Sequence, residues 1–178
     1  GADCLIGGEG RDTASYWGAT AGVEIYLSHI LDNQGEAAGD WYESIEVIDG
    51  SRFSDTIEGG KFDNTFWGDD GHDVLKGKAG NDTLAGNAGN DRLSGGKGVD
   101  TFQFAAGFGH DRITDFFATG ALHDVIVIDD TLFSDFNAVM ASAVQVGKTV
   151  VITLDAGNSI TLDRVSLAAL STDDFMFV

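Results

Sequence analysis

Apolar residues recur at every ninth position between Gly50 and Gln103, each at the centre of a short segment with a polar or small residue on at least one side. Successive side chains of a strand point to opposite faces, so each segment predicts a strand of about three residues whose middle side chain points inward. The inward residues are Ile57, Phe66, Leu75, Leu84, Leu93 and Phe102.

The other six residues of each nine-residue unit predict a tight turn. In register the units are GSRFSDTIE, GGKFDNTFW, GDDGHDVLK, GKAGNDTLA, GNAGNDRLS and GGKGVDTFQ. Glycine opens every unit and recurs at the fourth place of the last four, where its freedom of backbone conformation suits a turn. The fourth-place glycines are Gly71, Gly80, Gly89 and Gly98. Two units make one coil of about eighteen residues, and coils stack at roughly 4.8 Å. We therefore predict an all-β fold, a parallel β-roll.

A carboxylate or amide occupies the sixth place of every unit. These residues are Asp55, Asn64, Asp73, Asp82, Asp91 and Asp100. Because two units make one coil, alternate units lie on opposite edges, so we expect pairs 55–73, 73–91, 64–82 and 82–100 between neighbouring coils. Carboxylate and backbone carbonyl oxygens are the ligands that calcium prefers. The chain lacks the Cys and His clusters that softer metals require. The pattern predicts a roll loaded with several calcium ions.

Two further units extend this prediction. Asp12 ends the turn of GGEGRDTAS (7–15), although its partner in the next coil is not evident. Gly109 and Asp111 keep the turn pattern in AGFGHDRIT (106–114), so Asp111 is expected to pair with Asp91.

Asp55 and Asn64 leave an alternative open, because Phe53 and Phe62 replace the fourth-place glycine of their units. Aspartate in such a turn often only caps nearby backbone amides. These two residues are therefore candidates either for calcium ligands or for ordinary turn residues.

Charge and composition narrow the class of partner. Ten basic and twenty-nine acidic residues give the 178-residue chain a net charge of −19. Such a chain repels nucleic acid and anionic membranes, and it contains no apolar stretch long enough to span a bilayer. The acids are spread through the repeats, which favours multivalent cations. A single cysteine, Cys4, excludes an internal disulfide, so metal is the expected source of added stability.

The periodicity divides the chain into four segments. Residues 1–15 are expected to end an upstream repeat array, 16–49 to insert one or two wider coils, 50–114 to form the roll, and 115–178 to cap it. In the insertion, 23–27 and 44–48 alternate like strands. In the cap, 123–129, 149–154 and 159–162 read as strands, 131–144 as a short helix, and the last residues as a helical turn and a strand.

The repeats, followed by DTFQF (100–104), DRITDF (111–116) and DFMFV (174–178), resemble the C-terminal region of RTX (haemolysin-type) proteins exported by bacterial type I secretion. The resemblance implies a secreted, extracellular protein with an uncleaved C-terminal export signal that meets the type I apparatus. It also implies folding outside the cell on calcium, and an effector domain upstream, since Gly1, Asp3 and Leu5 already fit a truncated unit.

Three functions follow from these observations. The first is a non-catalytic calcium-binding module that supports the secretion and folding of its effector. The second is a carbohydrate-binding or epimerase-associated accessory module, whose polysaccharide partner would contact exposed Trp17, Trp41 or Trp67. Aromatics also commonly serve as packing area, which favours a structural role for the rings of the insertion. The third, a hydrolase fragment, lacks support because neither HExxH nor GxSxG occurs and the four histidines are scattered.

Overall fold

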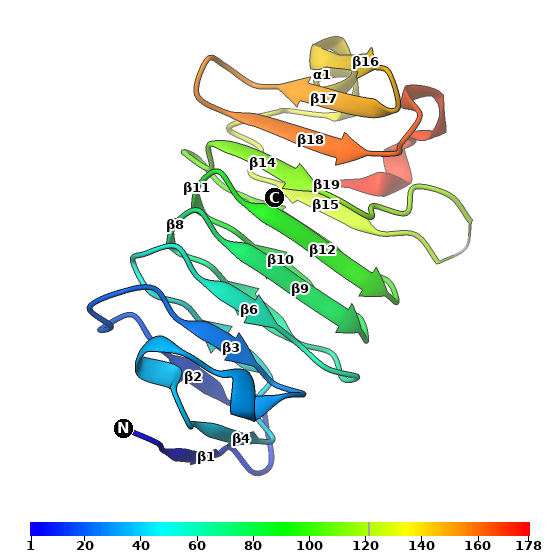
Figure 1. Ribbon diagram of the computed structural model, residues 1–178. Helices are drawn as coiled ribbons and strands as arrows, with labels where there is room; N and C mark the ends of the chain where they lie inside the picture. Colours follow the sequence, from blue (N-terminus) through cyan, green and yellow to red (C-terminus); the bar gives the residue numbers. More distant parts are fainter. Residues whose placement is uncertain (121) are drawn as a thin grey trace.

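The chain winds into a stack of coils, each of which adds one strand to each of two facing sheets (Figure 1). The computed structural model describes residues 1–120 and 122–178. Within these residues, one sheet has seven strands in the order β19-β15-β13-β10-β7-β5-β2. Their bounds are β2 Thr13–Ser15, β5 Val47–Asp49, β7 Thr65–Trp67, β10 Thr83–Ala85, β13 Thr101–Phe104, β15 Val125–Ile128 and β19 Phe175–Phe177.

The opposite sheet has eight strands over the same described residues, in the order β16-β17-β18-β14-β12-β9-β6-β3. Their bounds are β3 Glu24–Tyr26, β6 Thr56–Glu58, β9 Val74–Ala79, β12 Arg92–Lys97, β14 His110–Ile113, β16 Ala143–Val146, β17 Thr149–Thr153 and β18 Ser159–Asp163. The pairs are parallel except within β16-β17-β18. The predicted all-β parallel roll is confirmed.

The inward-pointing positions form one continuous core between the sheets. Phe66 pairs in register with Leu84, and Leu84 pairs with Phe102, so each coil advances the chain by two units. All six predicted inward residues, Ile57, Phe66, Leu75, Leu84, Leu93 and Phe102, are fully buried. The nine-residue hydrophobic period therefore determines both the sheets and their register.

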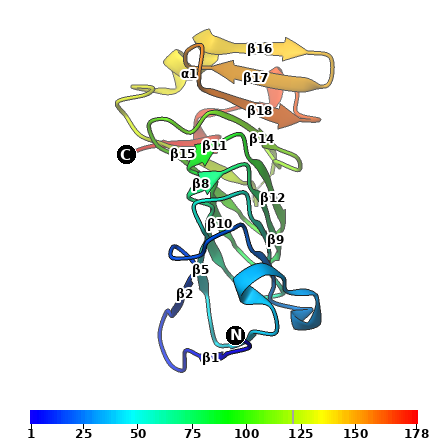
Figure 2. The same cartoon turned by 60° about the vertical axis from the view of Figure 1, so that its left-hand side comes forward.

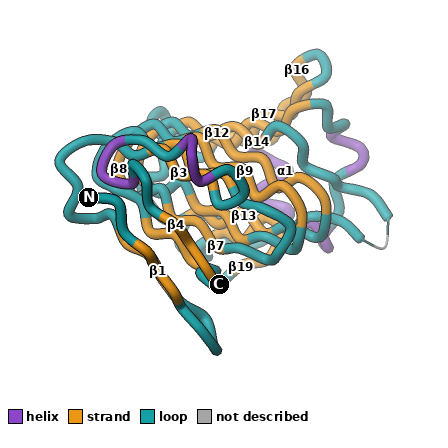
Figure 3. Tube along the Cα trace, turned by 60° about the horizontal axis from the view of Figure 1, so that its bottom comes forward, coloured by secondary structure: helices purple, strands orange, loops and turns teal. Residues whose placement is uncertain are grey.

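The N-terminal segment keeps the two sheets but adds a strand that the sequence did not indicate. β3 pairs with β6, and β5 lies between β2 and β7. Between β3 and β5 the chain forms two short 3-10 turns, η1 (Ile30–Asp32) and η2 (Gly35–Ala37). It then forms β4 (Trp41–Glu43), which pairs with β1 (Cys4–Ile6). Figures 2 and 3 show this segment beside the first coils at the N-terminal end of the stack.

Two tyrosines of the insertion have a structural role. The hydroxyl of Tyr16 donates to Asp40 Oδ2 at 2.7 Å and is also hydrogen-bonded to the hydroxyl of Tyr42. Asp40 is buried and accepts the backbone N–H of Asp3. Burial raises the pKa of Tyr42 to about 12, so the hydroxyl stays protonated at neutral pH. The two tyrosines therefore hold Asp40, which links the insertion to the N-terminal residues through Asp3.

The C-terminal segment caps the stack with mixed structure. The expected strands at 123–129, 149–154 and 159–162 are confirmed as β15, β17 and β18. The helix α1 (Phe136–Ser142) is shorter than the expected 131–144, because Asp135 caps it by accepting the N–H of Ala138 at 2.9 Å. The residues after α1 form β16, which makes an antiparallel hairpin with β17. Two 3-10 turns, η3 (Leu167–Ala169) and η4 (Thr172–Asp174), precede β19, the expected final strand.

Candidate calcium sites

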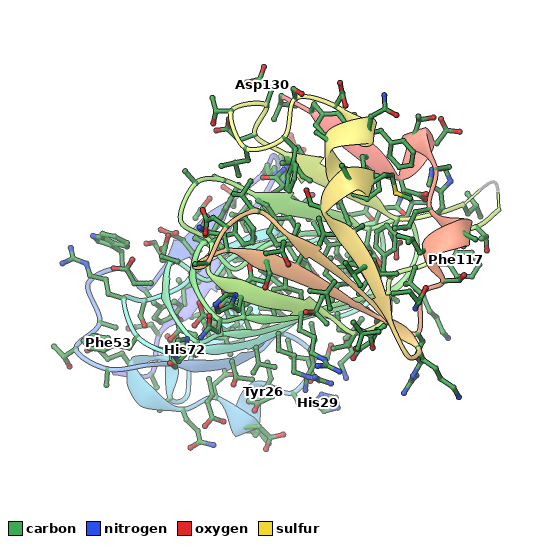
Figure 4. The ribbon with its side chains drawn as sticks, turned by 90° about the horizontal axis from the view of Figure 1, so that it is seen from above. Tyr26, His29, Phe53, His72, Phe117 and Asp130 are labelled. Carbon is green, nitrogen blue, oxygen red and sulfur yellow. The ribbon has the colours of Figure 1, made fainter. Side chains whose placement is uncertain are left out.

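The turns form two rows on opposite edges of the roll. The first row contains turns 50–55, 68–73, 86–91 and 106–111, and the second contains turns 7–12, 59–64, 77–82 and 95–100. Figure 4 shows Phe53 and His72 of the first row on one side and Phe117, which follows the second row, on the other. First-row turns also pair directly, through β8 (Asp70–Gly71) and β11 (Ala88–Gly89). Each row is therefore a ladder of stacked turns.

The sixth-place residues of the first row are linked from coil to coil. The backbone N–H of Asp55 donates to Asp73 Oδ1 at 2.8 Å, and that of Asp73 donates to Asp91 Oδ1 at 2.8 Å. The N–H of Asp91 donates to Asp111 Oδ1 at 2.9 Å. The structure thus brings together the residue pairs 55–73, 73–91 and 91–111.

The second row repeats this arrangement and continues further than the sequence indicated. The N–H groups of Asn64 and Asp82 donate to Asp82 Oδ1 and Asp100 Oδ1, at 2.7 and 2.9 Å. The N–H of Asp100 donates to Asp124 Oδ1 at 3.0 Å. Asp124 was missed because a longer connection separates it from Asp100. A signal existed, since HDVI at 123–126 repeats HDVL at 72–75.

The second carboxylate oxygen of most of these residues is buried and has no hydrogen-bond partner. The residues with such an Oδ2 are Asp12, Asp73, Asp82, Asp91, Asp100 and Asp111. In each of these six turns the second place has a left-handed backbone, at Gly8, Asp69, Lys78, Asn87, Gly96 and Gly107. A left-handed second place therefore recurs six times, each time in a turn whose sixth-place Oδ2 has no donor.

Glycine is required where neighbouring turns approach each other. A Cβ at Gly68 would overlap Asp73 Oδ2 and would lie 2.7 Å from the carbonyl oxygen of Gly86. A Cβ at the fourth place would meet backbone of the preceding turn: Phe53 for Gly71, Phe62 for Gly80, Gly71 for Gly89, Gly80 for Gly98 and Gly89 for Gly109. Backbone carbonyls and carboxylates therefore share the narrow space between turns.

This space suits a hard cation. Over the described residues, no three His, Cys, Asp or Glu side chains gather as a ready-made metal cluster. An ion between two turns must therefore combine carboxylate oxygens with backbone carbonyl oxygens, which calcium accepts and softer metals do not favour. The unpartnered Oδ2 atoms would hold it, and a bound calcium would supply the positive charge that these buried oxygens lack.

Three sixth-place residues differ from the six. Asp55 and Asp124 are buried, but both oxygens of each accept protein hydrogen bonds. Asn64 has an unpartnered Oδ1 but carries no charge. Asp12 has no repeat turn stacked next to it, because residues 44–46 replace that turn. The backbone N–H of Asp12 donates instead to Glu46 Oε2 at 3.1 Å. The neighbouring pairs of turns that share the recurring conformation are 68–73 with 86–91, 86–91 with 106–111, and 77–82 with 95–100.

Burial raises the pKa of the turn carboxylates well above their ordinary range. The pKa of Asp73 and of Asp111 rises to about 8, mainly because burial disfavours the charged form and partly because neighbouring carboxylates repel it. The pKa of Asp100 rises to about 7, and those of Asp82 and Asp91 to about 6, again mainly through burial. Without a cation, Asp73 and Asp111 therefore stay mainly protonated at neutral pH, whereas Asp82 and Asp91 are mainly ionised and carry the cost of a buried charge.

We expect the calcium-free chain to be more stable near pH 5 than near pH 8. An unfolded aspartate titrates near 3.9, so between that pH and about 8 the folded state binds more protons than the unfolded state. Stability is therefore greatest at low pH and is lost as the pH rises through about 6 to 8. The folded fraction, measured by circular dichroism in metal-free buffer between pH 5 and pH 8, tests this, and a folded fraction that increases with pH over this range would contradict it.

Comparisons with known proteins identify the family. A family model described as the RTX calcium-binding nonapeptide repeat matches four times, at residues 1–14, 49–84, 67–102 and 76–113. The chain is 33% identical to the solved AlgE6R3 subunit of the Azotobacter vinelandii mannuronan C5-epimerase, over 70% of this chain and 78% of that one, with a TM-score of 0.56. This chain belongs to the RTX calcium-binding nonapeptide-repeat family. Its repeats are calcium-binding, as the turn chemistry predicts.

A second RTX structure supports the fold. The AlgE6R2 subunit of the same Azotobacter vinelandii epimerase is 22% identical and has a TM-score of 0.51, with 94% of this chain and 92% of that chain covered. A comparison with curated protein sequences finds no match. The assignment of individual ligand residues stays a prediction, which the turn geometry narrows.

Proposed function

We propose that calcium binding between the stacked turns drives the folding of this RTX module outside the cell. The observation that carries this proposal is the buried carboxylate oxygen that recurs without a donor in six turns. Burying an unpaired carboxylate is costly, and removing that cost couples ion binding to folding. Because calcium binds the folded chain and not the unfolded one, its binding free energy adds to stability.

The wider role follows from the family resemblance. We infer that the module is exported by a type I apparatus while calcium is scarce, and that it folds where calcium is abundant, together with an effector carried on the same polypeptide. Residues 115–178 would cap the roll and carry the export signal. Where the structure describes the chain, no helix is both long enough and apolar enough to cross a membrane.

A calcium titration of chelated protein tests the folding step. Far-UV circular dichroism should change from a largely unfolded to a β spectrum as calcium is added, and magnesium at the same concentration should be much less effective, because it demands tighter octahedral geometry. A full β spectrum in excess chelator at pH 7.5 would overturn the proposal.

Three of the four histidines, the residues most often used as general bases, make hydrogen bonds within the fold. His72 Nδ1 accepts the backbone N–H of Asn90 at 2.9 Å, and His110 Nδ1 is hydrogen-bonded to the hydroxyl of Ser159. His123 is hydrogen-bonded to the carbonyl oxygens of Gly120 and Asp173. Aspartates that hold calcium stay deprotonated, which makes them poor general acids. We therefore propose that this module has no catalytic activity of its own.

Saccharide binding is a second candidate function, favoured by a surface hollow beside the turns of the second row. Where residues 44–46 replace a six-residue turn, a space of about 760 Å³ opens beside Tyr42, Lys61 and Phe62. This is an ordinary size for a ligand site, and aromatic faces with a few polar groups suit a sugar ring. The similarity to a subunit of a polysaccharide epimerase points the same way. The three tryptophans named from the sequence do not line this hollow.

The sugar hypothesis is tested with Phe62→Ala against Phe53→Ala, which removes an exposed phenylalanine from the opposite row. In saturating calcium, chemical shifts around the hollow should move on addition of uronate oligosaccharides, and Phe62→Ala should weaken that response while Phe53→Ala leaves it unchanged. Unmoved shifts, or equal losses in both variants, would remove this candidate.

A further inference from the structure

The turn at residues 50–55 belongs to the first row but has a different backbone. In the other three turns of that row, the second place is left-handed, at Asp69 (φ 69°), Asn87 (φ 64°) and Gly107 (φ 83°). Ser51, at the second place of turn 50–55, is not left-handed. In turn 50–55 this difference is accompanied by a hydrogen bond from the backbone N–H of Ser51 to Asp55.

Both carboxylate oxygens of Asp55 accept hydrogen bonds from protein donors. The backbone N–H of Ser51 donates to Asp55 Oδ2 at 2.6 Å, and the Ser51 hydroxyl donates to Oδ1 at 2.7 Å. The N–H of Val23, from the insertion, donates to the same Oδ1 at 2.7 Å. Ser51 is fully buried and Asp55 is 2% exposed, so water does not compete for these bonds. Asp73, one coil later, has no equivalent donors on its Oδ2.

Phe53 takes part in the same alternative turn. Its backbone N–H lies 3.1 Å from Ser51 Oγ, which accepts it and so fixes the hydroxyl under Asp55. The ring itself is about half exposed, so it does not block the space between turns. A Cβ at Gly71 would lie 2.7 Å from the Phe53 carbonyl carbon, which shows that turns 50–55 and 68–73 stack as closely as later turns do.

From this geometry we propose that Ser51 takes the place of a calcium ion on Asp55 and closes the first row at its N-terminal end. The space between turns 50–55 and 68–73 is then a latent calcium site: it has the position of a calcium site, but the hydrogen bonds from Ser51 to Asp55 prevent an ion from binding there. The first coils are held by protein donors, and the ion-dependent part of the row begins at Asp73. This inference rests on the proposed function, because it assumes that the later turns bind calcium.

The decisive experiment opens the latent site. The double variant Ser51→Gly and Phe53→Gly changes the turn to GGRGSD, which has glycine at the second and fourth places as turns 7–12 and 95–100 do. Native mass spectrometry in a calcium titration should then count one more bound ion per chain than in the parent. Arg52→Gly is the matched control, since it adds a glycine to the same turn but keeps Ser51 and Phe53, and it should leave the ion count unchanged.

A second variant tests the closed state directly. Asp55→Asn should leave the number of bound calcium ions unchanged, whereas Asp73→Asn should reduce it. Loss of an ion from Asp55→Asn, or no gain in a folded double variant, would overturn the role of Ser51. If the parent chain itself bound no calcium, the proposed function would fail instead, so the two failures are distinct. A double variant that did not fold would leave the Asp55→Asn ion count as the deciding result.

Discussion

Replacing Asp91 with alanine is expected to raise the calcium concentration needed for folding by at least about tenfold, as loss of a supporting metal-site residue commonly does. Asp91 lies between Asp73 and Asp111 in the first row. Its Oδ1 accepts the N–H of Asp73, and its own N–H donates to Asp111, so it borders the spaces on both sides. Its Oδ2 is buried without a partner. A single exchange is therefore expected to weaken two proposed inter-turn sites.

The midpoint of a calcium titration followed by circular dichroism measures this effect. Asp70→Ala is the matched control, because it removes the same charge from an exposed third place in the neighbouring turn 68–73. Asp100→Ala should have an intermediate effect, since the carboxylate of Asp124 beyond it is already filled by two backbone N–H groups. Equal midpoints for Asp91→Ala and Asp70→Ala would show that the sixth-place carboxylates do not hold the ions.

The sequence predicted the repeated part of the fold well, because one period governs several properties at once. A glycine every nine residues places the turns, and an apolar residue at the eighth place orients each strand. When two units fill a coil, Leu75 must lie between Ile57 and Leu93 in register, and the structure has these pairings. In a solenoid each repeat contacts only its neighbours, so the repeat length alone determines which residues pair between coils.

The insertion was predicted less well because its contacts are not periodic. β4 pairs with β1, more than thirty residues earlier, and the aligned residues Leu5 and Tyr42 share no repeat position that the sequence could reveal. Asp40 has no repeat position in the sequence, yet it is buried and accepts a hydrogen bond from Tyr16. A buried acid with specific partners looks the same in sequence as a solvated one.

The limits of the candidate site were also hidden from sequence. Asp55 and Asp73 occupy the same place in their units, but only Asp55 has donors on both oxygens. What separates them is the backbone angle at the second place, Ser51 in one turn and Asp69 in the other. Aspartate adopts the left-handed region more readily than most residues, but a residue type does not determine that angle. The sequence alone therefore could not decide whether Asp55 is a calcium ligand or an ordinary turn residue.

Gly89→Ala is expected to destabilise the roll by about 3 kcal/mol even in saturating calcium, the upper end of the range for overpacking. A Cβ at Gly89 would overlap the carbonyl oxygen of Gly71 in the preceding turn. Gly89 is not left-handed, so the requirement for glycine is one of space between two backbones. Because the obstacle is a backbone atom, no side-chain rotation relieves it. Denaturant unfolding at a fixed high calcium concentration gives the difference in free energy.

Two control variants separate crowding from other effects of alanine. Gly18→Ala should be nearly neutral, because its Cβ would meet nothing within 4 Å and its backbone is not left-handed. The Cβ of Gly107→Ala would also meet nothing within 4 Å, but Gly107 has a φ of 83°. Its loss of stability should therefore be smaller than that of Gly89→Ala, about 1 kcal/mol of backbone strain. A Gly89→Ala chain as stable as Gly18→Ala would contradict the close stacking of turns.

The response to calcium distinguishes the two kinds of damage. Asp91→Ala removes a proposed calcium ligand, so a sufficient excess of calcium should restore folding by mass action at the sites that remain. Gly89→Ala keeps every carboxylate but separates turn 86–91 from turn 68–73, so added calcium should not recover the lost stability. If excess calcium rescued both variants equally, the glycine would be acting through ion affinity alone, and the stacking of backbone on backbone would not be an independent requirement of this roll.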